Sequence, residues 1–262
     1  MHQAIEPRRV RAGRGARWLA EGFTLFRGQP FTWILYTAIL YAAVALATYV
    51  TVLGVLLLLI YPGVVAGLTR GAASQAGGGE LRLSHLWSGL RDNPVHLTTL
   101  GGVYLLGQVA IVSVMVALGG SEMQQIAAGR IDPADTEALA AALGAVMRSL
   151  LVGTALSVPL LMAMWFSPML VLFSRLAPLP ALGLSVRACW RNFGAFTVYG
   201  AIALAVLFLA MLPFGGLSPQ ANPGLWLVTP LLLPSVYASY RDVFGAAGMP
   251  AVAAGGGPPA PD

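Results

Sequence analysis

The chain has 262 residues, of which 57% are hydrophobic and only 10% are charged, and its mean hydropathy is +0.76. Soluble domains carry about 25% charged residues, so this composition excludes an ordinary soluble protein and indicates a membrane protein. All 15 basic residues are arginine, and together with 10 acidic residues they give a net charge of +5. The arginines are spread between apolar runs and do not gather on a polar domain, which argues against nucleic acid as a partner.

The N-terminal region is basic, with six arginines before residue 28. A basic start can open a signal peptide, but the apolar stretch after Gln29 is far longer than a signal-peptide core and has no small-x-small cleavage site. We therefore expect this region to be retained. Residues 1–11 are predicted to be a flexible basic segment, followed by a single membrane domain over residues 12–244.

Six apolar runs are long enough to cross a bilayer, which takes about 20 mostly apolar residues. Residues 31–69 contain no charge and are predicted to form two spans with a turn within 48–54. The remaining predicted spans cover residues 97–118, about 145–172, 195–212 and 225–240. The predicted fold class is therefore all-α, a polytopic membrane protein with six transmembrane helices.

The arginines predict the orientation of these spans. Thirteen of the 15 fall on one side of the six spans, and only Arg130 and Arg148 fall on the other. Basic residues are enriched in cytoplasmic loops, so both termini are predicted to be cytoplasmic.

A short segment with helical apolar spacing precedes each odd-numbered span and ends in arginine before a polar or helix-breaking corner. Such a helix can lie in the headgroup layer with tryptophan towards the acyl chains and arginine towards lipid phosphates. The simpler alternative is that these segments are charged loop ends. The residues assigned to lipid contact are Trp18, Trp87 and Trp190 with Arg27, Arg91 and Arg191.

Each even-numbered span ends in proline followed seven or eight residues later by arginine, as in Pro62 and Arg70. Together with the preceding segments, this predicts three repeats of an interfacial amphipathic helix and a transmembrane hairpin. The predicted repeats cover residues 12–71, 80–176 and 178–244.

The middle repeat is lengthened by residues 119–146, which are predicted to lie outside the cytoplasm. Asp132 and Pro133 favour a helix start there, and the Ala- and Leu-rich run that follows should continue into span four as far as a bend at Pro159. This helix either covers the outer ends of neighbouring spans or docks a periplasmic or membrane protein.

A stripe of small residues lies at the end of span two, where Gly63, Gly67 and Gly71 are four residues apart. Small residues at this spacing allow another helix to approach closely. We expect the partner to be another span of the same chain rather than a second subunit.

The chain resembles a group of uncharacterised bacterial inner-membrane proteins with six helices, organised like the membrane domain of some glycerophosphodiester phosphodiesterases. Three motifs carry the resemblance: WLAEGFTLFRGQP at 18–30, MAMWFSPMLV at 162–171 and ACWRNFGAFTVYG at 188–200. The resemblance implies the bacterial inner membrane as the location. It implies no reaction, substrate or functional residue.

The sequence shows no residue pattern typical of catalysis, metal binding or ion coupling. No ionisable residue lies in the centre of a predicted span, although ion-coupled carriers usually have one there. Glu21, Glu80 and Asp92 each lie near an arginine, so salt bridging is expected of them. The single cysteine, Cys189, excludes an intrachain disulfide, and no histidine has metal-ligand spacing, so no metal or cofactor is expected.

We therefore predict a non-enzymatic protein, either envelope-organising or an accessory subunit. The alternative is a small-solute or lipid transporter or a lipid-handling protein, and an intramembrane enzyme ranks third. A continuous polar cavity between the repeats would favour transport, and a dry, packed interior would favour a scaffold. Residues 245–262 are rich in Gly, Ala and Pro and are predicted to be a disordered tail.

Overall fold

The computed structural model describes residues 5–132, 135–215 and 222–245, and these ranges contain helices and no strand. A shorter helix precedes each pair of longer helices along the chain. The helices are α1 (Arg14–Gly28), α2 (Pro30–Tyr49), α3 (Thr51–Ala76), α4 (Ser84–Asp92), α5 (Pro94–Ala127), α6 (Thr136–Ser174), α7 (Pro178–Arg191), α8 (Phe193–Met211) and α9 (Pro223–Phe244), with a short 3-10 helix η1 (Leu212–Phe214) after α8.

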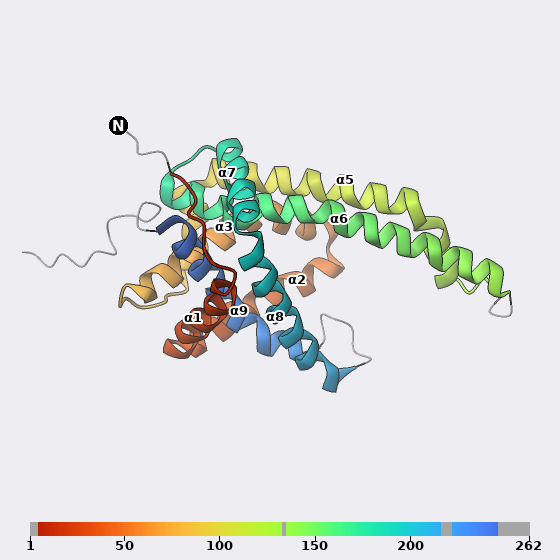
Figure 1. Cartoon of the computed structure of the whole chain (residues 1–262), viewed down its shortest axis with the longest axis horizontal. Helices are drawn as coiled ribbons and strands as arrows, with labels where there is room; N and C mark the ends of the chain where they lie inside the picture. Colours follow the sequence, from red (N-terminus) through yellow and green to blue (C-terminus); the bar gives the residue numbers. More distant parts are fainter. Residues whose placement is uncertain (1–4, 133–134, 216–221, 246–262) are drawn as a thin grey trace, which may run out of the picture.

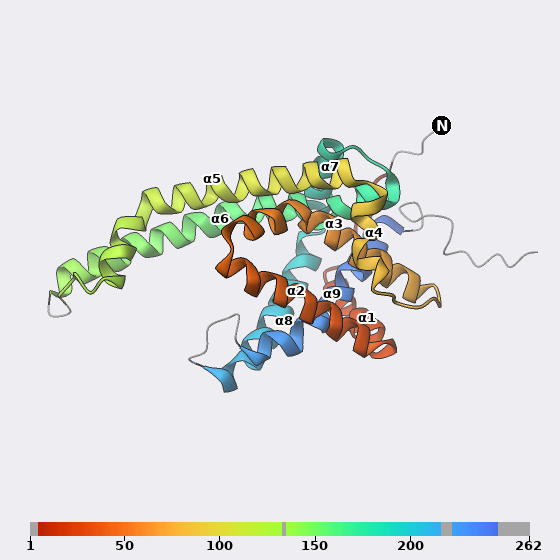
Figure 2. The same cartoon turned by 180° about the vertical axis from the view of Figure 1, so that it is seen from behind.

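Helices α1, α4 and α7 lie towards one side of the structure, and the described far ends of the pairs α2–α3, α5–α6 and α8–α9 point towards the other (Figure 1, Figure 2). The turn between α2 and α3 is a single extended residue, Val50, within the predicted turn region. Pro30 and Pro94 begin α2 and α5, where the missing proline N–H costs no helical hydrogen bond.

Helix α6 starts slightly later than the sequence suggested. Its cap is Asp135, whose side chain accepts a hydrogen bond from Ala138 N at 3.0 Å, and not Asp132. Two carboxylates three residues apart both suit a helix start, so the sequence alone did not distinguish them. Pro133 lies outside the described residues, and α6 continues through Pro159 and Pro168 without interruption.

Helices α5 and α6 run side by side and extend well past the other helices (Figure 1, Figure 2). At 1.5 Å per residue their 34 and 39 residues span about 51 and 58 Å, compared with about 30 Å for a hydrocarbon core. Gly119 faces the backbone of Ala145, and Ser149 Oγ donates to the carbonyl of Met115 at 2.7 Å. Small residues and one hydroxyl thus hold the extended part of the pair together.

The centre of the structure is filled by aromatic rings from α1, α6, α8 and α9. Trp18 and Phe166 are fully buried, and Phe196 lies edge-on to both, at centroid distances of 5.2 and 5.8 Å. Phe166 also packs edge-on against Phe244 at 5.2 Å. Edge-to-face pairs are a preferred arrangement of aromatic rings, and here they join α1, α6, α8 and α9.

Residues 5–11, expected to be flexible, lie against α7 and α9. Arg8 N donates to the carbonyl of Val243 at 2.8 Å, and Val10 N donates to Asn192 Oδ1 at 2.8 Å. Composition suggested flexibility because it does not reveal such long-range backbone partners. The predicted tail falls outside the described residues from position 246 onwards.

Five helices within the described residues are long and apolar enough to cross a membrane: α2, α3, α5, α6 and α8 with η1. Helix α9, which contains the predicted sixth span, is not among them. It has 22 residues, but two internal prolines, several hydroxyl side chains and the pair Arg241 and Asp242 lower its apolar character.

Candidate functional site

Polar and charged side chains gather where the short helices meet the ends of the long ones. At the junction of α1 and α9, Asp242 Oδ2 accepts hydrogen bonds from Arg14 Nε at 2.6 Å and Trp18 Nε1 at 2.8 Å. Glu21 then pairs with both Arg14, at 3.2 Å, and Arg241, at 2.8 Å. Chiefly because of the hydrogen bond to Asp242, the pKa of Arg14 is raised. This network joins the first helix to the last.

The prediction that Trp18 contacts lipid is wrong. Its side chain has no exposed surface, and its indole N–H is used by Asp242. Trp87 and Trp190 are 46% and 72% exposed and can reach the bilayer. Apolar periodicity identifies the covered face of a helix, but it does not say whether lipid or protein covers it.

Arg27, Arg91 and Arg191 lie in the last turns of α1, α4 and α7 and are exposed. Among the described residues, none of the three forms an ion pair. Arg27 lies over the ring of Phe23 at 5.8 Å. The three guanidinium groups therefore remain available to anions or water.

The glycine stripe of α3 receives α4. A Cβ atom at Gly67 would overlap the backbone carbonyls of His85 and Leu86, and one at Gly63 would overlap the side chain of Leu90. The predicted partner, another span of the same chain, is wrong, because the short helix α4 packs on the stripe. Small residues four positions apart predict that a helix approaches closely, but they do not predict which helix.

The expected salt bridges are confirmed. Asp92 pairs with Arg70, which ties the end of α4 to α3, and Glu80 pairs with Arg82 at 3.2 Å. Glu21 pairs across the α1–α9 junction as described above. These carboxylates are thus engaged in structural contacts.

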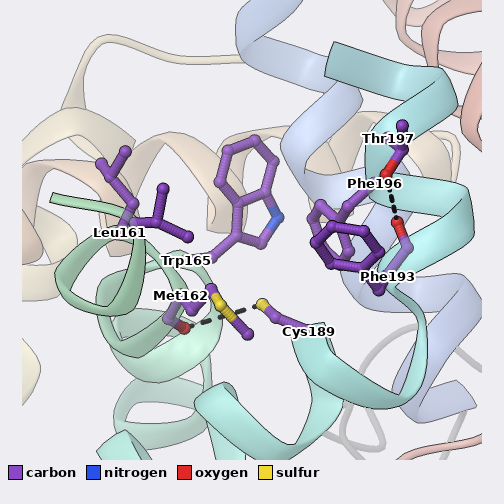
Figure 3. A pocket seen from close by; sticks show the side chains of 8 residues that line it. Leu161, Met162, Trp165, Cys189, Phe193, Phe196 and Thr197 are labelled. Carbon is purple, nitrogen blue, oxygen red and sulfur yellow. Dashed lines mark hydrogen bonds between the residues drawn. The ribbon is translucent and has the colours of Figure 1, made fainter. Parts of the chain in front are cut away.

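An apolar pocket of about 230 Å³ lies between α6, α7 and α8 (Figure 3). Figure 3 shows Trp165 on α6 opposite the rings of Phe193 and Phe196 on α8, with Met162 and Cys189 below. Burial raises the pKa of Cys189 to about 12, and its thiol donates to the carbonyl of Met162 at 3.6 Å. The pocket is lined by Val158, Leu161, Met162, Trp165, Cys189, Phe193, Phe196 and Thr197.

This pocket suits an apolar group and not a reaction. A thiol with a raised pKa carries little of the thiolate that attacks substrates. The lining contains no carboxylate or imidazole to act as an acid or base. Across the described ranges, no three His, Cys, Asp or Glu residues are grouped to hold a metal ion.

Comparison with known proteins agrees with a membrane protein. The chain is 32% identical over 255 residues to "Probable inner membrane protein BTH_II0599" of Burkholderia thailandensis, covering 90% of this chain and 93% of that protein. This chain belongs to the same family of inner-membrane proteins. No family model and no solved structure matches it. The organisation of the phosphodiesterase membrane domain is thus supported by the sequence motifs alone.

The sequence pointed to individual arginines and tryptophans, and it missed what the fold brings together. Asp242 and Arg14 lie 228 positions apart yet form the junction of α1 and α9. The sequence signal was the acidic residue directly after Arg241 at the end of an apolar helix, where an unpaired carboxylate is costly.

Proposed function

We propose that the protein is a non-enzymatic structural component of the inner membrane, either envelope-organising or an accessory subunit. The aromatic centre of the structure carries this proposal. Trp18, Phe166 and Tyr240 are fully buried, and they come from α1, α6 and α9. Close aromatic packing between these helices favours a rigid support over a path for a solute.

We also infer six spans in three units, with α9 as the sixth span. Each short helix packs on the last helix of the unit before it, α4 on α3 and α7 on α6, and α1 closes the ring on α9. The 22 residues of α9 extend about 33 Å, which suffices for a bilayer, and contacts with α1, α2, α3 and α8 shield its polar groups.

The polar corners that follow the short helices support the division into three similar units. Gln29 Oε1 accepts from Leu81 N at 2.6 Å, and Asn192 Oδ1 accepts from Val10 N at 2.8 Å. In both cases the corner amide binds the segment that leads into another short helix. Asn93 reaches the carbonyl of Val171 at 3.5 Å, near the end of α6.

In this arrangement the short helices lie on the cytoplasmic surface, with Arg27, Arg91 and Arg191 near anionic headgroups. Both termini are then cytoplasmic, and the far end of α5–α6 projects on the periplasmic side. Because this projection exceeds the bilayer, it offers a docking surface to a periplasmic or membrane protein through residues 119–146.

Deletion tests this role. Residues 121–142 are replaced by a short Gly-Ser linker, and full-length and deleted proteins are captured from native membranes in mild detergent. We expect the deleted protein to stay folded by gel filtration while a stoichiometric partner is lost. An unchanged set of partners would contradict docking through this projection.

A lipid-handling role is the second candidate, and the apolar pocket of Figure 3 favours it. Its rim residues Val158, Leu161 and Phe193 are 45%, 53% and 59% exposed, so an acyl chain can enter from the side. Trp165→Ala would enlarge the pocket and change the exchange rate of a fluorescent phospholipid between vesicles. Exchange at the rate of protein-free vesicles, by wild type and variant alike, would exclude this role.

A further inference from the structure

A second cavity, of about 410 Å³, lies on the other face of the α8 start. One wall is the N-terminal segment, residues 9–12, and the other is the corner between α7 and α8, residues 191–195. Arg9, Arg11 and Arg191 all line it, although the first two are 180 residues or more away from the third in the sequence.

The side chain of Asn192 builds this cavity. Its Oδ1 accepts from Val10 N at 2.8 Å and its Nδ2 donates to the carbonyl of Arg8 at 2.9 Å, so two hydrogen bonds fix the N-terminal segment against the corner. The side chain of Val10 packs on the hydrophobic core. Arg9 and Arg11, on either side of Val10, are exposed and line the cavity.

Within the described ranges, none of the three arginines that line this cavity, Arg9, Arg11 and Arg191, forms an ion pair. The carboxylates of the neighbouring junction, Glu21 and Asp242, are already paired with Arg14 and Arg241. An anion in the cavity would therefore meet exposed arginines that no carboxylate neutralises.

The start of α8 also lies in the cavity wall. Asn192 precedes α8 but makes no side-chain cap to it, because its amide is used by residues 8 and 10. Helix α7 ends at the same corner, so its partial negative charge offsets the partial positive charge of the α8 start, and the attraction for an anion comes from the arginines. Gly194 keeps this wall free of a side chain.

We infer that this cavity is a binding site for a phosphate group. Arginine pairs with phosphate through two parallel N–H bonds, and three arginines line this cavity. Trp190 and Phe193 flank the same corner, 72% and 59% exposed and 6.2 Å apart between ring centroids. Exposed aromatic rings of this kind suit the membrane interface, so a lipid headgroup is one source of the phosphate and free phosphate is the other. The site does not depend on the scaffold role.

The test uses two variants of equal charge. The cavity variant is Arg9→Gln, Arg11→Gln and Arg191→Gln, and the control is Arg17→Gln, Arg130→Gln and Arg187→Gln, three exposed arginines outside the cavity. Native mass spectrometry measures retention of one phosphatidylglycerol, with phosphatidylcholine as the neutral-lipid comparison. Titration with inorganic phosphate, followed by thermal shift, tests the second source. If the triple variant fails to fold, Arg191→Gln alone is compared with Arg187→Gln.

We expect the cavity variant to bind phosphatidylglycerol about tenfold more weakly, with the control within about twofold of wild type. Loss of a phosphate-induced shift only in the cavity variant, without phosphatidylglycerol retention, would identify free phosphate as the source. The inference is overturned if wild type binds neither probe, or if both variants weaken binding equally, which would indicate diffuse surface attraction.

Discussion

At the residue scale, Asp242 is the side chain on which the junction between α1 and α9 depends most. Its side chain is 17% exposed, and it accepts from both a guanidinium and an indole. A carboxylate this far from water is stable only while its donors remain in place. The junction therefore depends on the charge at this position more than the exposed ion pairs do.

Asp242→Asn should destabilise the protein by about 1–3 kcal/mol, since hydrogen bonds to a charged acceptor are lost or weakened. Glu80→Gln is the control, because the Glu80 and Arg82 side chains are 72% and 70% exposed and such pairs contribute about 0–1 kcal/mol. Unfolding in detergent is followed by circular dichroism. Equal losses for the two variants would argue against a special role for Asp242.

Gly67 offers a second test at this scale. A methyl group there would overlap backbone carbonyls of α4, which cannot rotate away, whereas one at Gly102 would meet nothing within 4 Å. Gly67→Ala should cost about 1–3 kcal/mol through overpacking, while Gly102→Ala should be neutral or gain up to about 1 kcal/mol in helix propensity. Melting temperatures of the two variants would show this. A Gly67→Ala protein as stable as Gly102→Ala would mean that α4 is not held against the stripe.

At the element scale, the sequence predicted helices better than their surroundings. The apolar spacing of α1, α4 and α7 was clear, and so were the corners that end them. What covers the apolar face of each short helix was not clear from the sequence. Trp18 is buried against protein and Trp190 is exposed, although both lie on similar amphipathic helices. The apolar period of a helix can be read from a single sequence. A contact such as that of Arg14 with Asp242 cannot, because it forms only when the first and last helices pack together.

The attachment of α4 to α3 should weaken in acid. Burial and the nearby Arg70 and Arg82 lower the pKa of His85, and its Nδ1 accepts from Arg82 N at 3.1 Å. The unfolded chain therefore binds this proton more readily than the folded one, so stability is complete above the ordinary histidine pKa and falls as pH decreases below it.

His85→Gln removes this titration and isolates it from other acid effects. We expect the melting temperature of wild type to fall more between pH 7.5 and 5.5 than that of the variant. Parallel pH curves for wild type and His85→Gln would exclude His85 as the source.

At the scale of the whole molecule, the contacts between the N-terminal segment and α9 also constrain the membrane topology. Arg8 N binds the carbonyl of Val243, so the N-terminal segment and the end of α9 share one side of the membrane. Gly215 follows η1 at the other end of α9. If α9 crosses the bilayer, residues 215 and 247, which flank it in the sequence, are on opposite sides, and if it does not, they are on the same side.

Cysteine labelling decides between five and six spans. In a Cys189→Ala background, two variants, Gly215→Cys and Ala247→Cys, each carry one thiol, before and after α9, and Gly215 is exposed. With a membrane-impermeant maleimide on spheroplasts, Gly215→Cys should react at once, whereas Ala247→Cys should react only after the inner membrane is permeabilised. This expectation follows from the arginine distribution and from the hydrogen bond that ties residue 8 to α9. Reaction of both thiols from the same side would remove α9 as the sixth span, and a reversal of the two would invert the orientation while keeping six spans.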